Sequence, residues 1–383
     1  MKPKFPTFFI AFTLLTFSFI ACHQDQNPKT LLFIGSYTEG VPSTGIYIYE
    51  LDHESEKLRA LYTEDSIVNP SFLKISTNGD FLYAVTKSQL ETHGSIAAFK
   101  VQPSTGKLTR INEQPAGGRN PVHLSISKDG DHLINSNYTD AGISCFKIEK
   151  DGSLEAYSQL LRFKDSSIVK GRQDEAHIHS TNFSPDGNFM FAQDLGADKI
   201  RTFAVGTTTE NFLKPAVGLS LKTKPGSGPR HFTFHPKGNF GYGIEELSGK
   251  ISRYRYSNGI LTFQQDYPSY ANKQAIYRAA DIHISPDGLF LYASNRGPKE
   301  NSISVFAIDQ GNGDLKLVER TPTYGDHPRN FVIDPSGKFL LVANQFSNNV
   351  VIFKRDLDTG KLSKLPQELT IANPSSLQTA TYN

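Results

Sequence analysis

Asp281-Ile282-His283-Ile284-Ser285 leads into Pro286-Asp287-Gly288, and Leu289-Phe290-Leu291-Tyr292-Ala293 follows directly. Apolar runs rich in β-branched and aromatic residues are typical of strands. Pro-Asp-Gly favours a tight turn, because proline fixes φ, aspartate bonds nearby backbone amides and glycine accepts a positive φ. The stretch therefore predicts two antiparallel strands joined by a short turn.

The same pattern recurs along the chain. The six turns are Asn78-Gly79-Asp80, Lys128-Asp129-Gly130, Pro185-Asp186-Gly187, Pro236-Lys237-Gly238, Pro286-Asp287-Gly288 and Pro335-Ser336-Gly337. Successive turn glycines are 51, 57, 51, 50 and 49 residues apart. A period near fifty with strand-type patterning predicts the four-stranded blades of an all-β propeller.

A seventh blade is assembled from both ends of the chain. Residues 31–62 contain three strand-like runs but no first strand. The run Asn373-Pro374-Ser375-Ser376-Leu377-Gln378 echoes Asn69-Pro70-Ser71-Phe72-Leu73-Lys74, which opens the next repeat. We therefore expect the C-terminal strand to complete the N-terminal blade, which closes the ring of seven blades and removes two open sheet edges.

Composition limits the class of protein. Residues 30–383 show no internal linker and predict one domain that grows by adding blades. The chain has no Trp, which argues against WD-type repeats. Its net charge is +2, and residues 1–21 hold two lysines and no acid, so the remainder is neutral. A neutral body argues against nucleic acid as a partner.

The N-terminus has the pattern of an export signal. Lys2 and Lys4 precede an apolar run from Phe8 to Ile20 that is too short for a comfortable membrane span. Phe19-Ile20-Ala21-Cys22 resembles a bacterial lipobox, although Phe19 stands where Leu is usual. The resemblance implies a signal peptide over residues 1–21, a lipid on Cys22, a polar tether over 22–29 and a protein of the periplasm or outer membrane. The alternative is an ordinary signal peptide with an incidental cysteine.

The predicted topology gathers polar residues at one end of the ring axis. The start of each first strand and the end of each second strand lie on the same face, together with the longer loops, including the charged insertion 162–176. The polar segments on this face are Asn120-Pro121-Val122-His123, His177-Ile178-His179, Gly228-Pro229-Arg230-His231, Asp281-Ile282-His283, His327-Pro328-Arg329-Asn330, Asn137-Tyr138, Gln193-Asp194, Glu245-Glu246, Asn295-Arg296 and Asn344-Gln345. Several arginines in an enclosed funnel favour a carboxylate or phosphate ligand.

Structural roles compete with this interpretation. His123 and His283 follow the strand alternation and are interpreted as half-buried packing residues. Three arginines could instead form ion pairs between blades, with Glu246 and Asp326 as partners. They are Arg230, Arg296 and Arg329. His179 is the preferred functional histidine, and its neighbour His177 is the alternative.

Taken in order, several segments resemble the seven-bladed lactonase family, which includes propeller-type 6-phosphogluconolactonases and fungal muconate-lactonizing enzymes. The resemblance covers residues 30–378 and depends on Gly35-Ser36-Tyr37-Thr38, Asn137-Tyr138, His179 with Ser184-Pro185-Asp186-Gly187, Gly228-Pro229-Arg230-His231-Phe232, Glu245-Glu246-Leu247, Ser294-Asn295-Arg296 and Pro328-Arg329-Asn330-Phe331.

The resemblance implies an axial site that handles a lactone or its open acid without a metal or other cofactor. The catalytic residues that it implies are His179, Arg230, Glu246 and Arg296. We expect Tyr138, His231, Arg329 and Gln345 to bind a small anionic lactone or sugar acid. Either His179 or Glu246 could be the general base, and Glu245 stands where relatives often have Asn.

An export signal is unexpected for an enzyme whose substrate is a phosphorylated lactone of the cytosol. Two other interpretations therefore remain. One is a lipid-anchored propeller that binds a ligand or protein without turnover, and the other is a cycloisomerase acting on a muconate. The sequence contains nothing that predicts the oligomeric state.

Overall fold

The computed structural model describes residues 1–4, 6 and 28–382. The predicted signal peptide and the lipidation site Cys22 lie almost wholly outside the described residues, as does most of the tether. Within the described part of the chain, no helix has the length and apolar character needed to cross a membrane. The described residues contain one short 3-10 helix, η1 (Thr209–Asn211), and are otherwise strands and loops.

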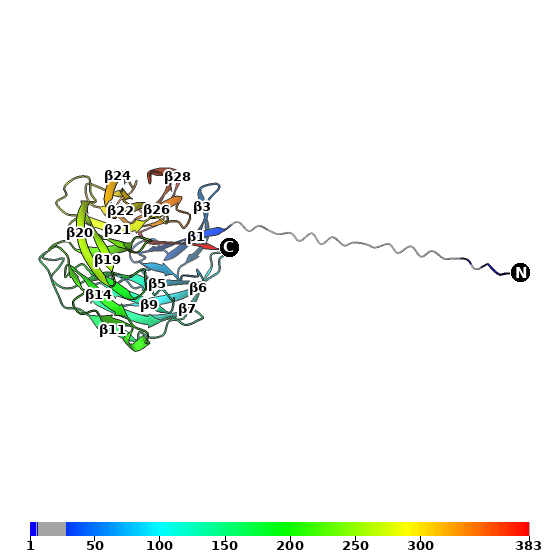
Figure 1. The fold of residues 1–383 in the computed structure, drawn as a ribbon, viewed down its shortest axis with the longest axis horizontal. Coiled ribbons are helices and arrows are strands. Elements are labelled where there is room, and N and C mark those ends of the chain that lie inside the picture. The colour runs from blue at the N-terminus through cyan, green and yellow to red at the C-terminus, as the bar shows by residue number, and fades with distance from the viewer. Residues whose placement is uncertain (5, 7–27, 383) are drawn as a thin grey trace.

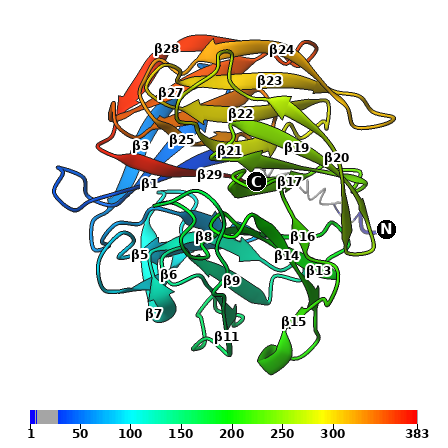
Figure 2. The same ribbon diagram turned by 90° about the vertical axis from the view of Figure 1, so that its left-hand side faces the viewer.

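Seven antiparallel sheets surround a central axis, as the sequence predicts (Figures 1 and 2). The innermost strands are β29 (Pro374–Tyr382), β4 (Leu73–Ile75), β8 (Pro121–Ile126), β12 (Ile178–Phe183), β17 (Pro229–Phe234), β21 (Arg278–Ile284) and β25 (Pro328–Ile333). Each contacts the next, and β25 contacts β29, so the ring is closed.

The other strands follow outward in each blade. The second strands are β1 (Lys29–Ser36), β5 (Phe81–Thr86), β9 (His132–Asn137), β13 (Phe189–Asp194), β18 (Phe240–Glu245), β22 (Phe290–Arg296) and β26 (Phe339–Asn344). The third strands are β2 (Ile46–Asp52), β6 (His93–Val101), β10 (Gly142–Lys147), β14 (Lys199–Val205), β19 (Lys250–Ser257), β23 (Ser302–Ile308) and β27 (Asn349–Arg355). The outer strands are β3 (Lys57–Glu64), β7 (Leu108–Arg119), β11 (Gln159–Arg162), β15 (Leu213–Pro215), β20 (Ile260–Pro268), β24 (Leu315–Pro322) and β28 (Leu362–Thr370), and β16 (Leu221–Lys222) also pairs with β14.

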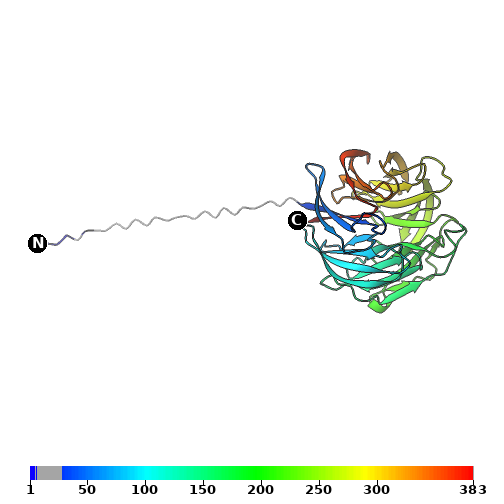
Figure 3. The ribbon, with the colours of Figure 1, turned by 180° about the vertical axis from the view of Figure 1, so that it is seen from behind.

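The predicted closure of the ring is confirmed. β29 pairs antiparallel with β1 from Lys29↔Tyr382 to Ile34↔Leu377. Figure 3 shows the C-terminus beside the blue N-terminal strand. The N-terminal blade is therefore the one sheet built from both ends of the described chain, and the pairing of β1 with β29 joins those ends within it.

The glycine turns form as the sequence predicts. In the Pro286-Asp287-Gly288 turn, the Asp287 carboxylate accepts hydrogen bonds from the Ser285 hydroxyl at 2.6 Å and the Leu289 amide at 2.8 Å. Gly288 has φ of 75°, which few other residues adopt without strain. These short turns lie at one end of the axis and leave the longer loops at the other.

Apolar side chains fill the spaces between neighbouring blades. One cluster joins the first two blades through residues such as Phe33, Leu73 and Phe99. Cys145 is fully buried in another cluster, where burial raises the pKa of its thiol and suits a packing role. Because this core lies between sheets, the inner edges of the innermost strands are free to present polar side chains along the axis.

Candidate active site

The long-loop end of the axis contains a cavity of about 420 Å³. Its lining residues are Gln89, Arg172, Glu246, Arg278, Arg296, His327, Arg329, Gln345 and Phe346, and we call this cavity the mouth. Four guanidinium groups face one carboxylate there. This excess of positive charge in a concave site favours an anionic ligand.

Glu246 is the carboxylate that joins these arginines. One of its oxygens accepts from Arg172 at 2.5 Å, and the other accepts from Arg230 and Arg296, each at 3.0 Å. Burial alone would raise the pKa of Glu246, but Arg296, Arg230 and Arg172 outweigh it and hold the pKa well below its usual range. Glu246 is therefore ionised, with both oxygens occupied.

The neighbouring Glu245 points the other way. It ends β18 and accepts hydrogen bonds from Ser252 at 2.6 Å and Ser248 at 2.7 Å. Successive side chains of a strand alternate between faces, so only one of two adjacent glutamates reaches the arginines. The geometry places Glu246 there.

Arg230 lies beneath the mouth and is only 2% exposed. Besides its bond to Glu246, it donates to the Ala280 carbonyl and lies 3.3 Å from His231 Nε2. Burial and the nearby Arg296 lower the pKa of Arg230. Arg230 and Arg296 do form the ion pairs with Glu246 that a structural role would require, and these pairs also gather positive charge under the mouth.

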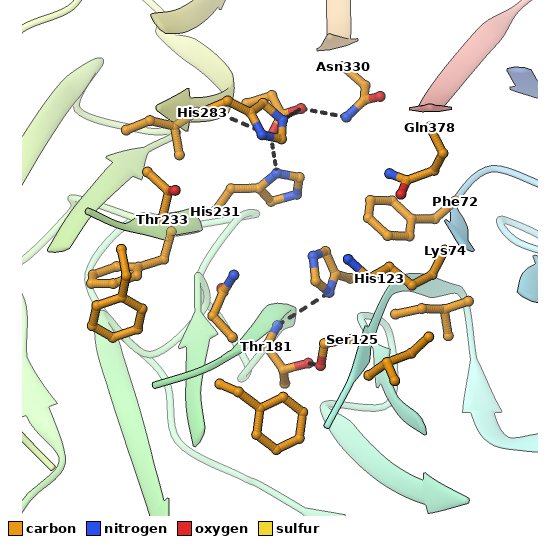
Figure 4. A pocket seen from close by; sticks show the side chains of 18 of the residues that line it. Phe72, Lys74, His123, Ser125, Thr181, His231, Thr233, His283, Asn330 and Gln378 are labelled. Atoms are coloured by element: carbon orange, nitrogen blue, oxygen red, sulfur yellow. Dashed lines mark hydrogen bonds and ion pairs between the residues drawn. The ribbon is translucent and has the colours of Figure 1, made fainter. Parts of the chain in front are cut away.

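His231 faces away from the mouth. Its Nδ1 lies 2.7 Å from the Asp281 carboxylate, which fixes the proton on that nitrogen and leaves Nε2 to accept from Arg230. His231 lines a second cavity on the axis, shown in Figure 4. The structure thus separates His231 from Arg329 and Gln345, although all three are predicted to bind the substrate.

His179 lies among the buried cations of the axis and is 6% exposed. Burial and the charge of Arg230 keep the pKa of His179 well below its usual range, so its imidazole is neutral. Its Nδ1 is buried and has no hydrogen-bond partner among the described residues. His179 thus combines a neutral imidazole with unused hydrogen-bonding capacity.

Tyr138 separates the two competing histidines. Its ring lies edge-on to His179 with centroids 5.6 Å apart, and it stacks flat on His177 at 4.2 Å. His177 Nδ1 also bonds the Tyr138 carbonyl at 3.0 Å. The geometry gives His177 a packing role. His179 does not line the mouth itself, and its ring centroid lies 5.1 Å from that of His231.

Two of the predicted binding residues line the mouth. Arg329 forms no ion pair with any described residue, and its guanidinium lies 5.6 Å from the centre of the Tyr37 ring. Gln345 is 7% exposed, and its Oε1 has no hydrogen-bond partner in the described part of the chain. A free cation and a free acceptor are the groups that a hydroxylated anion would need.

Several residues of the mouth were not predicted as binding residues. Arg172 comes from the charged insertion 162–176, Arg278 precedes Ala279 in β21, and His327 lies 3.2 Å from Arg296 Nη1. His327 has φ of 64° and stacks on Phe346 at 4.0 Å. A left-handed histidine costs backbone energy and is often found at functional sites. The charge of the insertion was the available signal for Arg172.

In the part of the chain that the structure describes, no group of three His, Cys, Asp or Glu side chains could hold a metal ion. The hydrogen-bonding groups on the axis are instead suited to an organic anion. Guanidinium groups bind carboxylate and phosphate oxygens through paired hydrogen bonds.

The chain is similar to known proteins over almost its whole length. The family model "Lactonase, 7-bladed beta-propeller" matches residues 31–379. A 6-phosphogluconolactonase of Formosa agariphila is 54% identical, over 92% of this chain and 100% of that protein. A 6-phosphogluconolactonase of Bacillus subtilis is 33% identical, over 90% of this chain and 97% of that protein. The solved periplasmic gluconolactonase of Pseudomonas aeruginosa has a TM-score of 0.86 at 33% identity, over 92% of this chain and 99% of that one. With its seven blades and the matched residues 31–379, this chain belongs to the seven-bladed β-propeller lactonase family.

Proposed function

We propose that this protein hydrolyses a sugar lactone that carries an anionic group, as a 6-phospho-aldonolactone does. The main support for this proposal is the mouth, where four arginines face the carboxylate of Glu246. Both oxygens of that carboxylate already accept hydrogen bonds from arginines. The names of the Formosa and Bacillus relatives support a phosphorylated lactone, and the Pseudomonas relative supports a related unphosphorylated one.

His179 is the general base in this proposal. Both oxygens of Glu246 are held by arginines, which makes a proton transfer to them unfavourable. His179 is neutral, as a general base must be, and a bound anion would offset the part of its lowered pKa that the surrounding arginines cause. Glu246 acts as a positioning residue that holds Arg172, Arg230 and Arg296.

The arginines divide into two groups by their existing contacts. Arg329 and the exposed Arg278 lie at the mouth and bind the anionic group of the substrate. Arg296 lines the cavity wall and Arg230 lies behind it, so their charge stabilises the oxyanion that forms at the lactone carbonyl. Tyr138 and Gln345 orient the sugar hydroxyls.

The chemical step is ordinary ester hydrolysis. Water loses a proton to His179 as its oxygen bonds to the carbonyl carbon. The bond from that carbon to the ring oxygen then breaks, and the ring oxygen takes the proton back from His179. The product is the open hydroxy acid, and His179 returns to its neutral form.

Acid release from a panel of phosphorylated and unphosphorylated aldonolactones tests the proposal. We expect turnover above spontaneous opening, with higher kcat/KM for phosphorylated members and a fall of about 10²-fold or more in kcat for His179→Ala. His93→Ala, an exposed histidine on β6, is the control and should retain wild-type rates. Saturable binding of the acids without turnover of any lactone would contradict the proposal and support a binding propeller.

We also propose that the protein is exported and attached to a membrane through a lipid on Cys22. The lipobox-like segment Phe19–Cys22 and the periplasmic location in the name of the Pseudomonas relative support this location. Incorporation of a fatty-acid probe into the wild-type protein and its loss in Cys22→Ser is the expected result. Equal labelling of both proteins, or labelling of neither, would reject the anchor.

A further inference from the structure

A second cavity, of about 500 Å³, lies at the opposite end of the axis. Pro185 and Pro236 of the glycine turns border it, and all seven innermost strands contribute to its wall. The polar residues of this wall are Lys74, His123, Ser125, Thr181, Asn182, His231, Thr233, Asp281, His283, Asn330 and Gln378. Figure 4 shows labelled side chains such as Lys74, His123 and His231 converging from different blades, and we call this cavity the lower cavity.

The carboxylate of the lower cavity is already satisfied. Asp281 accepts from His231 at 2.7 Å, from His283 at 3.0 Å and from the Asn330 side chain. It also accepts from the Ile282 amide at 2.9 Å. Asp281 therefore has little capacity left to neutralise another cation in the wall.

Lys74 is the cation left without a partner. It is half-buried in β4 and lines the cavity beside His123 (Figure 4). Burial lowers the pKa of Lys74, and no carboxylate or hydrogen bond from the described residues offsets that effect. Lys74 in turn helps to lower the pKa of His123, after burial and His231. An uncompensated cation of this kind is costly unless a ligand supplies the counter-charge.

Other wall groups can serve a hydroxylated ligand. Asn182 Oδ1 is buried and has no hydrogen-bond partner within the described chain, so it offers an acceptor. Thr233 and Gln378 add a hydroxyl and an amide to the wall. The volume falls within the range of small-molecule sites, which is about 300–1,000 Å³.

We propose that the lower cavity is a second ligand site, which binds a small hydroxylated anion through Lys74. The anionic group, a carboxylate or a phosphate, pairs with the Lys74 ammonium, and a hydroxyl donates to Asn182 Oδ1. The Asp281 network of His231, His283 and Asn330 forms the rigid opposite wall. The inference does not depend on lactone hydrolysis, because none of the mouth residues line this cavity.

Calorimetric titration with sodium gluconate and, separately, with inorganic phosphate tests the site. The proteins are the wild type, Lys74→Met, Lys74→Arg and Arg329→Met. Lys74→Met removes a cation from the lower cavity, Arg329→Met removes one from the mouth, and Lys74→Arg keeps the charge. We expect Arg329→Met to retain a binding event that Lys74→Met weakens by about tenfold or more, because a charge-assisted contact is lost. Lys74→Arg should retain it, and Lys74→Met should hydrolyse lactones at the wild-type rate.

Binding of gluconate alone, of phosphate alone or of both would support the site and identify its preferred anionic group. Two results would overturn the proposal. One is that Lys74→Met binds both anions with wild-type affinity. The other is that Arg329→Met shows no anion binding at all. Asn182→Leu provides a second variant should Lys74→Met fail to fold, and an unchanged affinity in Asn182→Leu would then count against the proposal.

Discussion

The two ends of the propeller axis use charge in opposite ways. Around the mouth, three arginines converge on Glu246, whereas Arg329 forms no ion pair with any described residue. In the lower cavity, the Asp281 carboxylate is held by His231, His283 and Asn330 instead of arginines, and Lys74 has no charged partner among the described residues. A carboxylate among arginines holds those cations in place for a ligand, whereas a carboxylate held by histidine and asparagine side chains mainly rigidifies its surroundings. The mouth is thus suited to chemistry and the lower cavity to binding.

The largest effect should come from Glu246→Gln. It leaves Arg230 and Arg296 buried without their counter-charge, so we expect the free energy of unfolding to fall by about 3 kcal/mol. We expect kcat/KM for the preferred lactone to fall by about 10²–10³-fold, because the arginines lose their alignment. Steady-state kinetics and urea denaturation measure the two effects.

Glu245→Gln is the matched control, since Glu245 bonds Ser248 and Ser252 instead of arginines. Its kinetics should stay close to those of the wild type. Equal losses in the two variants would show that the arginine contacts of Glu246 are not what matters for turnover.

Asp281→Asn should affect stability more than turnover. The amide nitrogen of Asn would face the donors of His283 and Asn330, so we expect about 2 kcal/mol less stability. Turnover should fall only a few-fold, because Asp281 does not line the mouth and is connected to Glu246 through His231 and Arg230. A loss of kcat as large as that of Glu246→Gln would remove the distinction between the two ends.

The pH dependence of stability should reveal the buried histidines. Burial and Arg230 lower the pKa of His231 to about 4, and His179 and His327 are lowered as well. The unfolded chain therefore binds more protons than the folded protein below pH ~6.5, and stability is lost as the pH falls from there toward 4. Each histidine contributes up to about 1.4 kcal/mol per pH unit in that range.

Urea denaturation of the wild type and His231→Gln between pH 7.5 and 4.5 checks this expectation. The variant should show a shallower dependence, since one buried neutral imidazole is gone. Parallel curves would mean that His231 takes up its proton equally in the folded and unfolded states. The pKa values of Glu246 and Asp281 are lowered, so the stability that these ionised carboxylates contribute should be lost only at more acidic pH.

Arg172→Gln should give the smallest effect. Arg172 is half-exposed and contacts one oxygen of Glu246, so we expect KM to rise about three- to tenfold with little change in kcat. Arg162→Gln, on the same insertion, is the control, because Arg162 bonds the Gly117 and Asp140 carbonyls instead. A similar rise in KM for both variants would point to the insertion as a whole.

Much of the fold was predictable because its signals are local and repeated. Each Pro-Asp-Gly turn and each apolar run restricts its own backbone, and the echo of Asn69-Pro70 in Asn373-Pro374 predicted the shared blade. Both asparagines adopt a left-handed φ, 47° and 49°, so the echo reflects one backbone geometry. The end of the axis at which the mouth lies was also predictable, because strand direction places the starts of the first strands and the ends of the second strands there.

Which polar side chains meet on that face was not predictable to the same extent. His231 and Arg230 are adjacent in sequence, at an irregularity in the pairing of β17 with β18. His231 turns toward Asp281 there, and Arg230 turns toward Glu246. Arg172 reaches the mouth from an irregular loop, whose path depends on contacts such as Gln173 with Asp198. Lys74 gave no sequence signal, because its isolation depends on residues from six other blades.

The sequence by itself determined the number of blades, the closure of the ring and the end of the axis where arginines collect, because turn chemistry and strand periodicity act within a few residues. Only the tertiary structure decided that Glu246 rather than Glu245 meets the arginines, that His177 stacks on Tyr138 while His179 is exposed to the charge of Arg230, and that the axis holds two cavities. These features depend on distances between side chains from different blades, which blade packing alone determines.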